Sequence, residues 1–191
     1  MLSEAMLFLL DVLLQPFAVI LLLRFHLQWL RAPLRNPIGE FVMALTDFVV
    51  LRMRRYIPSF RGLDTTSLLF ALLAEGLYLT GLVWVQDIPL TDFPLPGMLL
   101  LTGVKLIKIS LYLLMVVVFA QAILSWVNPY TSIAPLLTAV TQRFLQSLRR
   151  VLPIVGRFDL SALLLFIICQ LILIVPISML EVFASRLISH G

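Results

Sequence analysis

Two polar residues stand inside long apolar stretches of the sequence, where a polar side chain needs a specific reason to be present. Glu75 interrupts the run 66–85, and Gln170 interrupts the run 160–182. An acid at the centre of a membrane span costs roughly 2.5–3.5 kcal/mol on insertion scales, so its side chain should face protein or water or carry a proton. Glu75 is a candidate for proton or cation handling, and the alternative is a hydrogen-bonded packing role. We predict Gln170 as its partner.

A second set of polar residues lies just before two of the apolar runs. In both places an arginine pair is followed by a proline and then by an aspartate that directly precedes the run. A carboxylate at that point accepts hydrogen bonds from the free N–H groups of a first helical turn, so the simplest role of each aspartate is to cap a helix. The alternative is a small polar site at the cytoplasmic boundary of the membrane, whose members would be Arg54, Arg55, Asp64, Arg149, Arg150 and Asp159.

These features recur because a stretch of the chain occurs twice, at a spacing of 95 residues. The first copy holds Ala44, Thr46, Arg54, Arg55, Pro58, Asp64, Leu68 and Leu69, which return as Ala139, Thr141, Arg149, Arg150, Pro153, Asp159, Leu163 and Leu164. Internal duplication in an apolar chain is typical of membrane proteins built from two similar units. We therefore divide the chain into a first transmembrane repeat over residues 1–95 and a second over residues 96–191.

The composition indicates that these repeats lie in a membrane. Apolar residues make up 61% of the chain and charged residues 13%, whereas a soluble domain is nearer half apolar and a quarter charged. A helix that crosses a bilayer needs about 20 apolar residues, and four stretches qualify, at roughly 5–23, 66–85, 109–127 and 160–182. The sequence predicts an all-α integral membrane protein with four transmembrane helices, arranged as two parallel repeats.

Each repeat also holds a shorter helix between its two spans. In residues 133–150 apolar side chains recur every three or four positions and polar side chains fill most of the others, and residues 38–55 follow a similar pattern. This periodicity predicts two amphipathic helices, so that each repeat consists of a span, an amphipathic helix and a span. Each short helix lies either in the headgroup plane of the membrane or against the ends of the spans, and the sequence leaves both arrangements open.

Arginine is concentrated in the two segments that hold these amphipathic helices. The net charge is +4, and the arginines of the two segments are Arg31, Arg35, Arg52, Arg54, Arg55 and Arg61 in the first and Arg143, Arg149, Arg150 and Arg157 in the second. Loops on the cytoplasmic side carry an excess of Lys and Arg, so both segments should face the cytoplasm and both termini should lie outside. We expect these charges to meet membrane lipids, not nucleic acid.

The repeat also matches Asp11 with Lys108 if two residues are dropped near Trp29. Both residues would then lie close to the outer membrane interface, one in the first span of each repeat. They are a possible ion pair. The alternative is that each is solvated at the end of its span.

No arrangement of residues in the sequence is typical of an enzyme. His26 and His190 lie far apart, and Cys169 is the single cysteine, inside the last apolar run. A metal site needs several ligands at defined spacing. We therefore predict no catalytic residue, no metal site and no cofactor.

Six positions of the second repeat carry a resemblance to a known family. They are Trp126, Asn128, Pro129, Pro153, Gly156 and Ser161. This pattern resembles the signature of the bacterial YggT family, which includes the YlmG proteins of bacteria and plastids, and the first repeat matches it less closely. The resemblance implies an integral membrane protein whose relatives are linked to osmotic stress or potassium handling, to envelope or division organisation, or to cytochrome assembly in plastids. It implies no catalytic residue.

Two hypotheses of function follow. The first is a scaffold or assembly factor for membrane or envelope complexes, which uses its amphipathic helices to contact lipid and a membrane-protein partner. The second is a small oligomeric protein that handles an ion, potassium or a proton, and contributes to tolerance of osmotic stress. A homo-oligomer is compatible with either hypothesis and is needed by the second, because four spans alone make a thin pathway.

Overall fold

The computed structural model describes residues 2–57, 62–85, 95–128, 130–150 and 160–189. The regular structure in these ranges is helical, and the helices are α1 (Leu2–Trp29), α2 (Pro37–Met53), α3 (Thr65–Val85), α4 (Leu95–Val127), α5 (Ala134–Arg149), α6 (Leu160–Ile172), the π-helical turn η1 (Leu173–Ile177) and α7 (Ser178–Ser189). The last three follow one another without a break and form a single long span.

Four helical stretches are long and apolar enough to cross a membrane. They are Ser3–Trp29, Thr65–Val85, Leu95–Ser125 and Leu160–Ile188. The predicted all-α class with four spans is confirmed. The third span begins earlier than the sequence pattern predicts, because Lys105 and Lys108 lie inside α4 and do not end it. Lysine has an unbranched side chain that a helix accommodates well, and its alkyl stem can lie along apolar surface.

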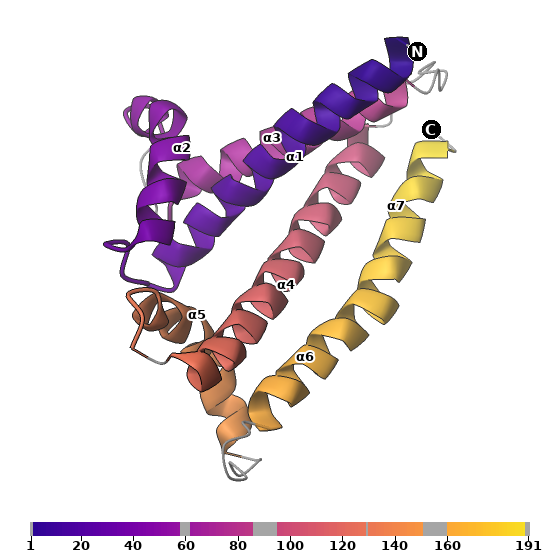
Figure 1. Cartoon of the computed structure of the whole chain (residues 1–191). Helices are drawn as coiled ribbons and strands as arrows, with labels where there is room; N and C mark the ends of the chain where they lie inside the picture. The colour runs from indigo at the N-terminus through magenta and orange to yellow at the C-terminus, as the bar shows by residue number, and fades with distance from the viewer. Residues whose placement is uncertain (1, 58–61, 86–94, 129, 151–159, 190–191) are drawn as a thin grey trace.

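Figure 1 shows how the spans are ordered. The spans α1 and α3 run side by side, α4 packs next to them, and the α6–α7 span lies on the far side of α4. The start of α1 and the end of α7 lie at one end of the bundle, whereas α2 and α5 lie at the other. We call this other end the α2/α5 end.

The two repeats have the same order of elements, which allows equivalent positions to be assigned. Trp29 and Trp126 set an offset of 97 residues between α1 and α4, and Thr66 and Ser161 set an offset of 95 residues between α3 and the α6–α7 span. In each repeat the first span packs against the last. The position of the boundary between the repeats at residues 95 and 96 stays a prediction.

The start of α2 is fixed by its local sequence. Asn36 caps the helix, because its Oδ1 accepts hydrogen bonds from the backbone N–H groups of Ile38 at 3.1 Å and Gly39 at 3.0 Å. Its Nδ2 donates to the carbonyl of Pro33 at 2.6 Å. Pro37 occupies the first helical position, where a missing N–H costs nothing. The chain therefore turns from α1 into α2 within a few residues.

The last span contains a π-helical turn for an identifiable reason. Pro176 lies inside η1 and has no N–H to donate to the preceding turn. In the same segment the Oγ of Ser178 donates to the carbonyls of Ile174 and, at 3.2 Å, of Val175. A local change to π-helical geometry is one way in which a membrane helix tolerates an internal proline.

A prediction follows for Gly39 in the first turn of α2. A Cβ atom at this position would lie 2.8 Å from the backbone Cα of Leu34, and backbone cannot move aside as a side chain can. We expect Gly39→Ala to destabilise the protein by about 1–3 kcal/mol, the usual cost of overpacking, measured by thermal unfolding in detergent. Gly103→Ala is the matched control, because a Cβ there meets nothing within 4 Å. Equal unfolding temperatures for both variants would contradict the predicted clash.

Candidate functional site

A buried arginine on α1 organises the polar residues of the first repeat. The side chain of Arg24 is 3% exposed, although it lies in a helix that crosses the bilayer. Its Nη1 donates to Oγ1 of Thr46 at 2.6 Å and to Oδ1 of Asp47 at 2.7 Å, both on α2. Its Nε lies 3.4 Å from Oδ2 of Asp64, directly before α3. One guanidinium therefore ties three helices together.

Asp64 is the second centre of this network and is 1% exposed. Its Oδ2 accepts from the hydroxyl of Ser67 at 2.7 Å and lies 3.4 Å from Nη2 of Arg54, and its Oδ1 accepts from the backbone N–H of Ser67 at 3.4 Å. The residue thus lies at the start of α3 as a cap and also pairs with two arginines. We call this set the Arg24 cluster, which comprises Arg24, Thr46, Asp47, Arg54, Asp64 and Ser67.

The charges of the Arg24 cluster balance, with two arginines against two aspartates. Removing charges from water is costly, and their mutual attraction offsets this cost only when the geometry is good and the remaining polar atoms are hydrogen-bonded. The contacts of Arg24 with Thr46 and Asp47 have good geometry, whereas its buried Nε has no hydrogen-bond partner and lies 3.4 Å from Oδ2 of Asp64. Removal of Arg24 would leave the buried carboxylate of Asp64 without its contact to this cation.

Arg54, Arg55 and Asp64 were predicted as members of a site in this region, whereas Arg24 and Asp47 were not. Arg55 lies outside the cluster, because its Nη2 donates to the hydroxyl of the exposed Tyr56 at 2.6 Å and its guanidinium lies 4.8 Å from that ring. Arg24 directly follows the apolar run 5–23 and was not assigned to any candidate site. The signal that could have found it is a polar residue at the equivalent position of the other repeat, Gln121.

The second repeat carries an uncharged version of the same contacts. Gln121, the equivalent of Arg24, accepts through Oε1 from the hydroxyl of Thr141 and donates through Nε2 to Thr138 at 3.4 Å. Thr141 is the equivalent of Thr46, and the exposed Gln142 stands where Asp47 does. Arginine and its acidic partner have thus both been replaced by glutamine. The contacts between the first span and the short helix are thus charged in the first repeat and uncharged in the second, whereas Arg149 and Asp159 keep the charges of Arg54 and Asp64.

The other predicted members of the boundary site lie in the second repeat. Arg149 and Arg150 are exposed at the end of α5. Asp159 lies outside the described residues. The structure therefore describes all predicted members of the first copy of the site, but only the two arginines of the second copy.

Glu75 on α3 is buried without a hydrogen bond. Its exposed fraction is 0%, and neither carboxyl oxygen has a hydrogen-bond partner. The half-buried Lys105 of α4 interacts with it electrostatically, and the neighbouring Gly76 approaches Thr102 of α4. The acid therefore lies on the side of α3 that faces α4.

The predicted partnership between Glu75 and Gln170 is wrong. Gln170 lies on α6 with an exposed side chain, while Glu75 is enclosed on α3. The physical reason is the order of the spans, because α4 separates α3 from α6 (Figure 1). Equivalent positions of two repeats need not meet at a common axis when the repeats are arranged in an open row.

The predicted ion pair between Asp11 and Lys108 is also wrong. Nζ of Lys108 donates to both carboxyl oxygens of Glu181 at 2.9 Å, which joins α4 to α7. Oδ1 of Asp11 accepts from the hydroxyl of Tyr78 at 2.7 Å, which joins α1 to α3. Each residue therefore finds its partner inside its own repeat, where the first and last spans are neighbours.

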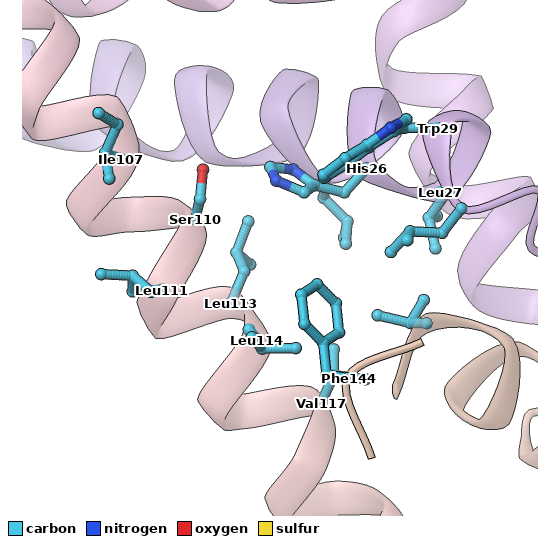
Figure 2. A pocket seen from close by; sticks show the side chains of 13 residues that line it. His26, Leu27, Trp29, Ile107, Ser110, Leu111, Leu113, Leu114, Val117 and Phe144 are labelled. Atoms are coloured by element: carbon cyan, nitrogen blue, oxygen red, sulfur yellow. The ribbon is translucent and has the colours of Figure 1, made fainter. Parts of the chain in front are cut away.

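An apolar cavity of about 190 Å³ lies between α1, α4 and α5. Figure 2 shows His26 and Trp29 on one side of it and Ser110, Leu114 and Phe144 around the rest. Nδ1 of His26 donates to the carbonyl of Leu22 at 2.7 Å, and Oγ of Ser110 donates to that of Leu106 at 2.8 Å. Both polar side chains thus bond to their own helices. Among the described residues, no group of three or more His, Cys, Asp or Glu side chains could hold a metal ion.

The motif residues of the second repeat are only partly described. Trp126 belongs to the last turn of α4, and Oδ1 of Asn128 accepts from the backbone N–H of Tyr130 at 3.2 Å, which turns the chain toward α5. Ser161 is buried in the first turn of α6. Pro129, Pro153 and Gly156 lie outside the described residues.

The fold and the paired polar contacts define a class of protein, namely a four-span membrane protein built from a duplicated span–helix–span unit. The CCB3/YggT family model matches the chain twice, at residues 3–85 and 100–180. The chain belongs to this family. The two matches begin 97 residues apart and end 95 residues apart, which agrees with the offsets between the repeats.

The chain is similar to several bacterial proteins of uncharacterised function. It is 34% identical over 165 residues to an uncharacterised protein encoded in the proC 3′ region of Vibrio alginolyticus, covering 86% of this chain and 89% of the relative. It is 30% identical over 173 residues to protein PA0392 of Pseudomonas aeruginosa, covering 90% and 87%, and 30% identical over 169 residues to YggT of Escherichia coli K12, covering 86% and 85%. No solved structure matches the chain.

The Arg24 cluster yields a prediction about charge balance. We expect Arg24→Gln to destabilise the protein by about 3–5 kcal/mol, because it leaves the buried Asp64 and the partly exposed Asp47 without their central cation. The double variant Arg24→Gln/Asp47→Gln reproduces the pair found in the second repeat and should recover part of this loss. Thermal unfolding in detergent provides the measurement.

The control for this experiment is Arg55→Gln, which removes an exposed guanidinium outside the cluster and should change stability by less than about 0.5 kcal/mol. If the destabilisation of the double variant equalled the sum of the destabilisations of the two single variants, the coupling between Arg24 and Asp47 would be refuted.

Proposed function

We propose that this protein is a scaffold or assembly factor of the bacterial inner membrane, and that α2 is the element with which it holds a membrane-protein partner. The observation that carries the proposal is a largely exposed apolar face of α2, which the described chain touches at Phe48, whose ring centroid lies 6.1 Å from that of Phe17. Phe41 and Phe48 are 59% and 66% exposed on this face, and Leu45 and Leu51 are exposed beside them. The residues recur at helical spacing and form one stripe.

The opposite face of α2 is fixed to the bundle. Val42, Thr46 and Val50 are buried against the spans, and Thr46 and Asp47 hold Arg24. The aromatic face is therefore presented by a rigid helix, which lowers the entropy lost when a partner binds. Exposed aromatic residues next to arginines are the composition enriched at interaction sites, and Arg52 and Arg55 lie at the end of the same stripe.

The helix α5 differs in the character of its exposed face. It buries Leu136, Leu137, Val140 and Leu145 against the spans, and its exposed positions include Gln142, Arg143 and Gln146. A polar outer face is suited to water. The contrast supports a packing role for α5 and a binding role for α2, although the two helices occupy equivalent places in the repeats.

We further propose that the α2/α5 end lies in the cytoplasm and that both termini lie in the periplasm. The support is the placement of the described arginines of both segments at this end of the bundle and the general excess of Lys and Arg in cytoplasmic loops. In this orientation the arginines of α2 lie near anionic lipid headgroups, which attract basic segments. The partner is then a protein at the inner surface of the membrane.

A photo-crosslinking amino acid at position 48 tests the scaffold function. With the full chain in native membranes, we expect position 48 to give a protein adduct of defined size that Phe41→Ser abolishes. The matched control is position 143, the exposed equivalent of position 48 on α5, which should give no such adduct. Adducts with lipid alone at position 48, or equal protein adducts at both positions, would contradict the proposal.

A second candidate function, ion or proton handling, is supported by a single observation at Glu75. An enclosed carboxyl group whose oxygens have no hydrogen-bond partner can take up a proton or a small cation. Lys105 and Tyr78 provide further polar groups near the same region of α3 and α4. Transport of this kind would connect the protein with tolerance of osmotic stress.

Flux measurements on proteoliposomes separate the two functions. If Glu75 carries an ion or a proton, the purified protein should conduct, and Glu75→Gln should lower the flux to that of empty liposomes because the amide neither carries a negative charge nor exchanges a proton at neutral pH. Gln170→Glu is the control, since it alters the equivalent exposed position. Absence of flux in the unaltered protein at several ion compositions would eliminate this second candidate and leave the scaffold.

A further inference from the structure

The two repeats are joined by a contact between α3 and α4. On the α3 side of this contact, Ala71 and Glu75 are fully buried. On the α4 side, Thr102 and Leu106 are buried, and Leu106 belongs to the same apolar cluster as Ala71. A Cβ atom on Gly76 would lie 3.8 Å from Oγ1 of Thr102, which fixes the register of the contact. We call this contact the internal joint.

The equivalents of the α3 positions in the second repeat are exposed. Counting 95 residues on, Ala71 corresponds to Phe166, Glu75 to Gln170 and Gly76 to Leu171. Phe166 and Leu171 are 40% and 56% exposed, and Gln170 is exposed between them. The outer face of α6 thus has the position and register of the inner face of α3, but no helix of the described chain covers it.

The equivalents of the α4 positions in the first repeat are exposed as well. Counting 97 residues back, Thr102 corresponds to Ala5, Leu106 to Leu9 and Ile109 to Val12. Ala5 is exposed, and Leu9 and Val12 are 54% and 50% exposed. The outer face of α1 therefore corresponds to the face of α4 that takes part in the internal joint, and among the described residues no helix covers it.

We propose that copies of this chain associate in the membrane by repeating the internal joint between copies, with α6 of one copy packed against α1 of the next. Because the repeats are parallel, the next copy keeps the same orientation in the membrane as the first. The row of spans in Figure 1 is open, with the α1/α3 pair and the α6–α7 span on opposite sides of α4, so both faces remain available after the chain has folded.

The occupant is a second copy, because faces equivalent to both sides of the internal joint are present in this chain at matching register. A lipid chain would cover the same apolar side chains without this register, so the position of a crosslink distinguishes the two occupants. Between copies the charged elements of the internal joint are absent, because Gln170 replaces Glu75 and Phe8 replaces Lys105. Association therefore requires no buried ion pair.

Disulfide crosslinking tests this register directly. In a Cys169→Ser background, one tagged copy carries Ala5→Cys and a differently tagged copy carries Leu171→Cys, the pair equivalent to Thr102 and Gly76 of the internal joint. After oxidation of native membranes we expect a linked product that carries both tags. The internal control is one chain with Gly76→Cys and Thr102→Cys, which should link within the chain and verify that the joint and the oxidation conditions are intact.

The specificity control replaces Leu171→Cys with Leu77→Cys, an exposed position of α3 at similar depth that faces away from the internal joint. The proposed contact requires several-fold more product from position 171 than from position 77.

Equal products would indicate random collision, and no product despite a linked internal control would assign the face to lipid. A dominant product between two copies of Leu171→Cys would indicate a two-fold contact through α6. Each of these outcomes overturns the proposal.

Discussion

The fold of the first repeat depends on one buried guanidinium. Arg24 reaches α2 through Thr46 and Asp47 and the start of α3 through Asp64, so three helices share one charge centre. Because an arginine in the hydrocarbon region is costly without partners, the helices must approach closely enough to supply them. The position of α2 follows from this requirement, and so does the exposure of its aromatic face, which lies opposite the residues that hold Arg24.

The two repeats share the same order of elements but differ in the charge and polarity of equivalent residues. The second repeat retains the threonine and replaces the charged pair with Gln121 and Gln142, and its short helix α5 exposes a polar face where α2 exposes an apolar one. The same division appears at Glu75, which is enclosed, and Gln170, which is exposed. Glutamine in the second repeat thus replaces Arg24, Asp47 and Glu75 of the first, whereas Arg149 and Asp159 keep the charges of Arg54 and Asp64.

Much of the fold could be predicted from the sequence, whereas little of the site could. The four spans, the short helix in each repeat and the two offsets follow from hydropathy and from recurring residues such as Asp64, and the family matches agree with them. The partners of Lys108 and Gln170 were predicted wrongly, because equivalence in a repeat was taken to mean proximity. Arg24 was missed since it adjoins an apolar run, and nothing local in the sequence indicates that its partners come from α2 and α3.

The sequence by itself determined that this is a duplicated membrane protein of four spans, because the cost of polar groups in lipid and the period of a helix act on neighbouring residues along the chain. Only the tertiary structure decided which polar groups meet, which face of α2 is left exposed and which spans lie on the two sides of α4. These properties depend on which helices become neighbours and in what order, and that order is set by packing and ion pairs between residues far apart in the sequence.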